Sequence, residues 1–255
     1  MRSAFSLVEL SIVLVILGLL TGGILAGQSL IRAAELRAVG TEYNRFQAAF
    51  MTFRDKYFEI PGDSANATKF FGRMTTDSAC WFSPGTTVQS PGACNGTGDG
   101  MVGAAFGGTG NIEESFQVWR HLMAAGLIEG NYNGRYISSS GNCDANNCPN
   151  AKLAGGAQWA LWHRASPWNA TQINPYLSIG KSLSTGVTVP GSVGGIMSAE
   201  EVRNIDTKMD DGKPGIGAVH VRSTYLECSD GTGSAAEYRL SQRDNTCYIE
   251  FIVKL

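Results

Sequence analysis

A run of 22 residues without a charge, from Leu10 to Ile31, is the strongest constraint on how this chain folds. It reads LSIVLVILGLLTGGILAGQSLI. At a rise of about 1.5 Å per residue, a helix of this length crosses a hydrocarbon core about 30 Å thick. The run has no clear small-residue cleavage site at its end, unlike a secretory signal. The sequence therefore predicts a retained membrane-spanning helix.

Glu9 stands just before this run, at the cytoplasmic end of the predicted membrane helix. A carboxylate inside a membrane helix costs several kcal/mol unless it is paired, so an acid at this place indicates a function. The alternative is that Glu9 lies in the headgroup zone, where an acid needs no special role. The residue types alone leave both interpretations open.

The residues around Glu9 resemble the N-terminal motif of type IV prepilins, over roughly the first thirty residues. The matching residues are Ala4-Phe5-Ser6-Leu7-Val8-Glu9-Leu10 and Ser11-Ile12-Val13-Leu14-Val15-Ile16-Leu17-Gly18. The resemblance implies that prepilin peptidase cuts between Ala4 and Phe5, that Phe5 is then N-methylated, and that Glu9 acts in assembly. Ala4 is a departure, because the family usually has glycine there, but alanine is also small. Residues 1–4 are then a leader, whose Arg2 favours a cytoplasmic N-terminus.

The resemblance implies a structural subunit of a type IV pilus-like filament. The expected precursor is a single-pass protein of the inner membrane that an assembly platform there adds to a homo-oligomeric or mixed pilin filament. The assembled filament is an extracellular pilus or, in the alternative of a type II secretion pseudopilin, a periplasmic pseudopilus. A second alternative is an envelope enzyme or carbohydrate-binding domain on an uncleaved anchor, which has no need of Glu9.

A charge pair explains why a filament of apolar helices would keep Glu9. Cleavage before Phe5 creates an α-amino group with a pKa of about 7.7 to 8.0, whereas a glutamate titrates near 4.3. At neutral pH the two groups carry opposite charges. We hypothesise that Glu9 of one subunit pairs with the Phe5 amine of its neighbour, because pairing offsets the cost of burying each charge.

Beyond Arg32 the pattern becomes amphipathic, with a helical stripe sustained over about six turns. The stripe consists of Leu36, Val39, Tyr43, Phe46, Phe50, Phe53 and Tyr57. The helix should end near Ile60, because Pro61 restrains the residue before it. We expect residues 5–31 to be the transmembrane and filament-core part, 32–60 the amphipathic half, and 61–255 a globular extracytoplasmic head. A dimeric coiled coil is the alternative use of the stripe.

The head is expected to mix helices and strands. Asn111 to Glu114 and Ser198 to Glu201 have the spacing of capping boxes that open helices. Residues 217–222 and 247–255 read as strands from their β-branched and aromatic content. The predicted fold class is α+β: a long N-terminal α-helix, half transmembrane and half amphipathic, packed on a globular head with an antiparallel β-sheet. In the family that the N-terminus resembles, this arrangement is called the pilin fold.

Six cysteines fall into three close couples, which is typical of an oxidising compartment. Pairing in sequence order is the economical expectation: Cys80 with Cys94, Cys143 with Cys148 and Cys228 with Cys247. A zinc site is the alternative, and only the middle couple has near-ligand spacing. The last couple resembles the disulfide-bounded C-terminal region of many pilins.

Two loops concentrate oxygen ligands suited to calcium, which some pseudopilins bind in their heads. The first loop offers Asn95, Thr97 and Asp99, with glycines where an EF-hand-like loop turns, but it lacks a closing carboxylate. The second offers Asp206, Asp210 and Asp211. The alternative for both loops is a solvated turn in which the side chains cap backbone amides. Calcium is thus the one cofactor that the sequence suggests.

Charge and motifs argue against other classes of function. There are 20 Lys and Arg against 22 Asp and Glu, so no basic field invites nucleic acid. His121, His163 and His220 accompany no metalloprotease, nucleophile-elbow or phosphate-loop motif, and we predict that the chain is not an enzyme. A tryptophan group is expected in the core, with a sugar platform as the alternative: Trp159, Trp162 and Trp168.

Overall fold

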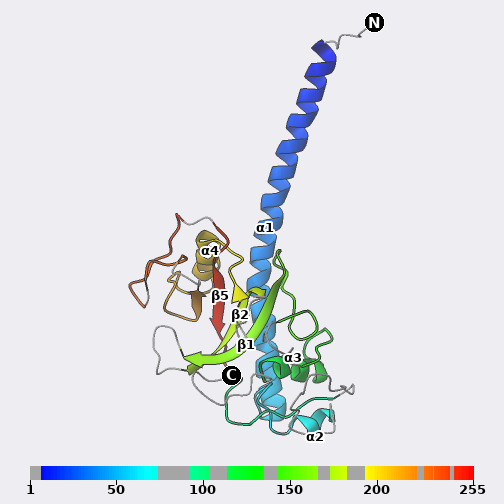
Figure 1. Cartoon of the computed structure of the whole chain (residues 1–255), viewed down its shortest axis with the longest axis vertical. Coiled ribbons are helices and arrows are strands. Elements are labelled where there is room, and N and C mark those ends of the chain that lie inside the picture. The colour runs from blue at the N-terminus through cyan, green and yellow to red at the C-terminus, as the bar shows by residue number, and fades with distance from the viewer. Residues whose placement is uncertain are drawn as a thin grey trace.

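The structure is a computed structural model of the 255-residue chain. It describes residues 7–73, 92–103, 114–134, 143–165, 173–182, 193–222, 227–231, 233–241 and 244–255. Its architecture is a globular head with one long helix that projects far beyond it (Figure 1).

The long helix α1 spans Leu7–Tyr57, 51 residues without a break. Its first half stands clear of the head and its second half runs through it (Figure 1). The helix ends three residues earlier than the position expected from Pro61. Phe58 adopts a left-handed backbone with φ of 57°, and its N–H still bonds to Arg54 O at 2.8 Å. A left-handed residue directly after the last turn is a common helix terminator, so the stop is made before the proline is reached.

The head contains a small antiparallel sheet, which confirms the α+β class. The sheet order is β1-β2-β5-β4, and the short β3 pairs with β2. The antiparallel pairs include Trp159 opposite Ile179 and Tyr176 opposite Ile252. The elements of the head are α2 (Ala67–Phe71), α3 (Glu114–Ala124), β1 (Ala157–Ala165), β2 (Ile173–Ser182), β3 (Val193–Gly194), α4 (Ala199–Met209), β4 (Val219–Arg222) and β5 (Tyr248–Ile252).

The apolar stripe of α1 packs on the chain's own head. Phe46 makes edge contacts with Trp119 at 5.2 Å and with Trp159 at 5.6 Å between ring centroids. Tyr43 stacks on Phe251 of β5 at 4.5 Å. The four most buried members of the stripe are at most 1% exposed: Val39, Phe46, Phe50 and Phe53. A stripe buried in this way is not available for a coiled coil with another chain. Trp159 and Trp162 are buried as predicted, and Trp168 lies outside the described residues.

Local sequence signals position the other predicted elements. Ser198 Oγ accepts from Glu201 N, and Glu201 Oε2 accepts from Ser198 N at 2.9 Å, so the capping box of α4 is confirmed. The predicted C-terminal strands are present as β4 and β5. Asn111 lies outside the described residues, but the helix expected after it is present as α3. Gly126, with φ of 72°, follows the end of α3 as expected.

Candidate functional site

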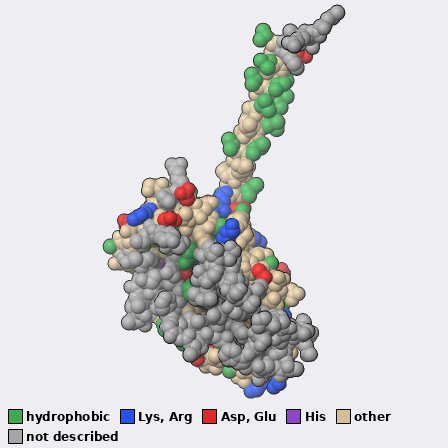
Figure 2. Space-filling model, in the orientation of Figure 1, with side chains coloured by type: hydrophobic (Ala, Val, Ile, Leu, Met, Phe, Trp, Pro, Cys, Tyr) green, Lys and Arg blue, Asp and Glu red, His purple; other side chains and the backbone are tan. Residues whose placement is uncertain are grey.

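The exposed part of α1 from Leu7 to Ile31, named the rod below, is the largest apolar surface among the described residues. It is long and apolar enough to cross a membrane. Its only charged residue is Glu9, which is exposed in the first turn of the helix. Figure 2 shows apolar side chains along the rod and mixed charges on the head below it. Between 50% and 86% of each large apolar side chain is exposed: Leu7, Val8, Leu10, Ile12, Val13, Leu14, Val15, Ile16, Leu17, Leu19, Leu20, Ile24, Leu25, Leu30 and Ile31.

The rod is joined to the head by a charged contact at its base. Arg32 Nε lies 2.6 Å from Glu201 Oε1, and Arg32 Nη2 donates to Glu201 Oε2 at 2.9 Å. Nη2 also donates to the carbonyl of Ile196 at 3.0 Å. Because this two-pronged contact fixes both distance and orientation, it holds α1 against α4 at the point where the rod leaves the head. The direction of the rod is thus set by the head.

A groove runs along α1 beside α4, just below this contact. Its volume is about 390 Å³, and Arg37 and Lys208 are the charged residues that line it. Gly40 faces Met209 across the helix contact, where an added Cβ would lie 3.1 Å from the sulfur.

The residues of the predicted cleavage site, Ala4 and Phe5, lie outside the described residues, so cleavage and methylation stay predictions. Glu9 is the one member of the predicted processing and assembly set that the structure places. It lies near the end of the rod farthest from the head.

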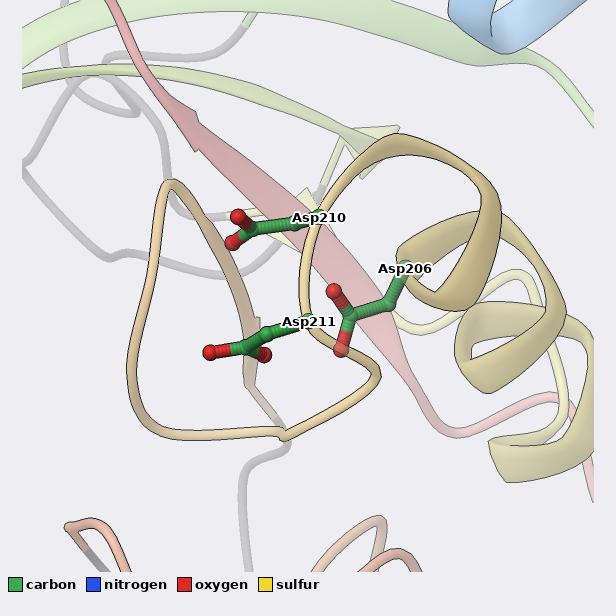
Figure 3. Close-up of side chains that lie close together, drawn as sticks. All are labelled: Asp206, Asp210 and Asp211. Carbon is green, nitrogen blue, oxygen red and sulfur yellow. The ribbon is translucent and has the colours of Figure 1, made fainter.

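An acidic cluster forms where α4 ends. Asp206 belongs to the last turn of α4, Asp210 caps it, and Asp211 follows. Each of the three offers a carboxylate oxygen within 4.8 Å of the others. In Figure 3 the side chain of Asp206 points from α4 toward the turn after the helix, where the side chains of Asp210 and Asp211 extend side by side. The structure therefore brings together the second of the two predicted calcium sets.

Backbone amides hold two of these carboxylates in place. Asp210 Oδ2 accepts from the N–H groups of Ala218 and Val219, the latter at 3.0 Å, which ties the end of α4 to β4. Asp211 Oδ1 accepts from Lys213 N at 2.8 Å. Each carboxylate thus uses one oxygen for the protein backbone. The Asp211 contact is of the local capping kind expected for a turn, whereas the Asp210 contacts reach amides further along the chain.

Asp206 has a different environment, because it is fully buried at 0% exposure. Its Oδ2 accepts from the hydroxyl of Tyr238 at 2.7 Å, and its Oδ1 has no hydrogen-bond partner. The N–H of Gly212 lies near the carboxylate without making a hydrogen bond to Oδ1. Burial raises the pKa of Asp206 to about 6, against the hydrogen bond from Tyr238, which lowers it. No local sequence signal points to Tyr238, which follows Asp206 by 32 residues.

The first predicted calcium loop is organised around a different carboxylate. Asp63, which is 4% exposed, accepts from the backbone N–H groups of Gly98 at 2.6 Å and Gly100 at 2.8 Å. Thr97 also donates its hydroxyl to Asp63. A loop whose N–H groups converge on one point favours an anion there. Asp63 already supplies that anion.

The expected ligand oxygens of this loop have protein partners as well. Asn95 Oδ1 accepts from Thr68 N at 2.9 Å, and Asp99 Oδ1 accepts from Met101 N at 2.9 Å. These are the contacts of a capped turn rather than of converging ligands. A cation at Asn95, Thr97 and Asp99 stays a prediction to which this geometry adds no support.

Glu114, at the start of α3, is a second buried carboxylate in this region, at 2% exposure. Its oxygens accept from Thr97 N at 2.7 Å and from Gly103 N at 3.1 Å. Burial raises the pKa of Glu114 to about 7, with a smaller contribution of the same sign from the charge of Asp63. The two backbone hydrogen bonds oppose this shift.

This carboxylate makes stability depend on pH in a defined window. Because its pKa in the folded chain lies above the unfolded value of 4.5, the stabilisation it provides is complete below pH 4.5 and is lost as the pH rises through about 7. We expect the unfolding free energy, compared with that of Glu114→Gln, to fall by about 3 kcal/mol across this window. Denaturant titrations of both proteins at several pH values measure the difference. A pH-independent difference would contradict the assignment.

The histidines serve as neutral structural groups where the structure describes their contacts. His121 Nδ1 accepts from Gly62 N at 2.9 Å, and His163 Nδ1 accepts from Val102 N at 2.7 Å. Burial lowers the pKa of each to about 4. Both rings therefore connect a helix or a strand to a loop.

Two of the three predicted disulfides are present: Cys143–Cys148 and Cys228–Cys247. The zinc alternative at the middle couple is therefore excluded in this structure. Cys80 lies outside the described residues, and its pairing with Cys94 stays a prediction. Comparisons with protein-family models, with curated proteins and with solved structures found no match to this chain. Its function is therefore inferred from its own residues.

Proposed function

We propose that this chain is the structural subunit of a type IV pilus-like filament. In this proposal it is made as an inner-membrane precursor with a cytoplasmic N-terminus, cut before Phe5 by prepilin peptidase, and added to the filament by an inner-membrane assembly platform. The motif around Phe5 and Glu9 supports the processing steps. In this proposal the head is the extracytoplasmic domain of a pilin fold, packed on the second half of α1.

One observation carries the proposal: the exposed apolar rod that projects from the head (Figure 1). Burying a large aliphatic side chain is worth about 1.5 to 3 kcal/mol, and each of the rod's large apolar side chains is at least half exposed. Lipid covers such a surface in a membrane. Outside the membrane, only an equally apolar surface does so, and the rods of other copies supply one. The contact between Arg32 and Glu201 keeps the rod extended from the head and so presents it for packing.

Glu9 distinguishes a filament subunit from a passively anchored protein. An anchor needs only apolar residues, whereas this rod keeps one acid beside the residue that would become the new N-terminus. A positive amine on a neighbouring subunit neutralises that acid in the apolar interior of a filament. If the chain were an envelope enzyme or a carbohydrate-binding domain on an uncleaved anchor, the presence of Glu9 would have no explanation.

Pilins and pseudopilins share this processing and assembly chemistry, but a pilus extends outside the cell and a pseudopilus stays in the periplasm. A pilus subunit is recovered from the outside of the cell by shearing, whereas a pseudopilus subunit remains in the periplasm. The location of the processed chain therefore separates these two forms of the same proposal.

Intact-mass measurement of membrane and sheared fractions tests the proposal. In filaments we expect a chain that begins at N-methylated Phe5, with residues 1–4 removed. The membrane fraction should contain both the precursor and the processed chain. A native protein that is always monomeric and still begins at Met1 would refute the proposal.

A further inference from the structure

We propose that Asp206, Asp210 and Asp211 bind a hard divalent cation, with Ca²⁺ the best match, and that Tyr238 links this cation site to the segment between Cys228 and Cys247. All the groups involved lie in the head of a single chain. The inference is therefore independent of filament assembly.

The buried oxygen of Asp206 is the observation that points to a ligand. Asp206 is 0% exposed, yet its Oδ1 has no hydrogen-bond partner. A buried polar atom without a partner is rare in folded proteins and destabilises the fold. Figure 3 shows the side chain directed from α4 toward the turn that carries Asp210 and Asp211. A cation between the three carboxylates supplies the missing partner.

Each of the three carboxylates keeps one oxygen for a metal. Tyr238 occupies Oδ2 of Asp206, backbone amides occupy Oδ2 of Asp210, and Lys213 N occupies Oδ1 of Asp211. In the part of the chain that the structure describes, no hydrogen bond is made by the other oxygen of each pair. The protein contacts thus orient the carboxylates and leave one ligand atom on each.

The donor set selects the class of metal. It consists of carboxylate oxygens only, which suit Ca²⁺, Mg²⁺ and Mn²⁺ rather than the softer metals that prefer thiolate or imidazole. Exposure increases from buried Asp206 to exposed Asp211, so water completes the coordination from the open side. An irregular site of this kind suits Ca²⁺ better than Mg²⁺, which demands near-ideal octahedral geometry.

The neighbouring lysine does not neutralise the cluster in place of a metal. Lys213 Nζ lies 2.8 Å from Glu237 Oε1, so its charge is directed to that carboxylate. Three carboxylates with oxygens within 4.8 Å of one another repel unless an added positive charge lies between them. A divalent cation provides that charge.

Tyr238 extends the effect of the cation to a distant part of the chain. It is 8% exposed and lies between Cys228 and Cys247. Its hydroxyl donates to the same carboxylate whose other oxygen faces the cluster. Fixing Asp206 by a cation therefore also fixes the hydroxyl of Tyr238 and the segment that carries it. Tyr238 is a positioning residue, and the aspartates are the ligands.

Thermal melts of the full-length chain in detergent test the binding. With free Ca²⁺ at about 100 times its dissociation constant, we expect the melting temperature to rise by about 8 °C relative to the chelator-treated protein. Asp211→Asn, which changes an exposed ligand and leaves the buried ones intact, should weaken Ca²⁺ binding at least tenfold. Asp244→Asn, at an exposed aspartate outside the cluster, is the matched control and should bind like the unchanged chain.

Hydrogen exchange tests the link to Tyr238. Ca²⁺ should slow exchange of the amides between Cys228 and Cys247 in the unchanged chain. Tyr238→Phe keeps the ring but removes the hydroxyl, so it should still bind Ca²⁺ and lose this added protection. Absence of any calcium-dependent shift in the unchanged chain, or equal binding by Asp211→Asn and Asp244→Asn, would refute the site. Equal protection in Tyr238→Phe would refute the link.

Discussion

Replacing Glu9 with leucine is expected to reduce filament yield at least tenfold while the chain still enters the membrane. Leucine makes the rod more apolar, so insertion is not impaired. In the filament, however, the amine of a neighbouring Phe5 would then be buried without its counter-charge. Leaving one partner of a buried ion pair alone costs about 3 to 5 kcal/mol, and each 1.4 kcal/mol is a factor of about ten in an equilibrium.

Filament yield is measured as the amount of chain in the sheared or periplasmic filament fraction, divided by the total processed chain. Glu9→Gln is the second variant, because it keeps the shape of the side chain and removes only the charge. Asp55→Asn is the matched control: it also removes one acid from α1, at an exposed position outside the rod. Normal filaments from Glu9→Leu would show that no charge pair at Glu9 holds the subunits together.

The long helix could be predicted from the sequence because all its signals are local. The uncharged run and the stripe from Leu36 to Tyr57 repeat with the helical period over many turns, and no later part of the chain is needed to read them. The capping box at Ser198 is equally local, and α4 begins at the next residue. The end of α1 was predicted less accurately, because nothing in the sequence indicates that Phe58 adopts a left-handed backbone.

The first two strands escaped prediction for a physical reason. Residues 157–163 of β1 are all buried, so the strand lacks the alternation of apolar and polar residues that marks a strand with one face in water. A continuous apolar segment does not distinguish strand from helix by its period. The antiparallel pairing of β1 with β2 then brings in contacts that only the folded chain shows.

The contacts that organise the buried carboxylates are also long in sequence. Glu42 in α1 accepts from Trp159 Nε1 at 3.0 Å, across 117 residues. The cluster of three aspartates was visible in the sequence because its members are neighbours, whereas its link to Tyr238 was not. The role of Asp63 in the loop from Asn95 was not visible for the same reason, since Asp63 comes to the loop from an earlier turn.

Removing the Cys228–Cys247 disulfide is expected to lower the unfolding free energy by about 3 kcal/mol. The bond closes a loop with a sequence separation of 19 residues, and in the chain-entropy model such a closure restricts the unfolded chain by this amount. The two cysteines are 1% and 0% exposed and belong to the core. Cys247 also pairs with Met197 through the backbone and precedes β5, so the loop is anchored beside the central sheet.

The double change to alanine at Cys228 and Cys247 tests this in full-length protein under oxidising conditions, because it leaves no free thiol at either position. We expect a fall in melting temperature of about 10 °C, since each kcal/mol shifts the melting temperature of a chain of this size by about 2 to 4 °C. The matched control is the same double change at Cys143 and Cys148, whose separation of 5 residues restricts the unfolded chain by only about 2 kcal/mol. If the short loop proves as important as the long one, loop closure is not the source of the stabilisation, and packing of the buried sulfur atoms must account for it instead.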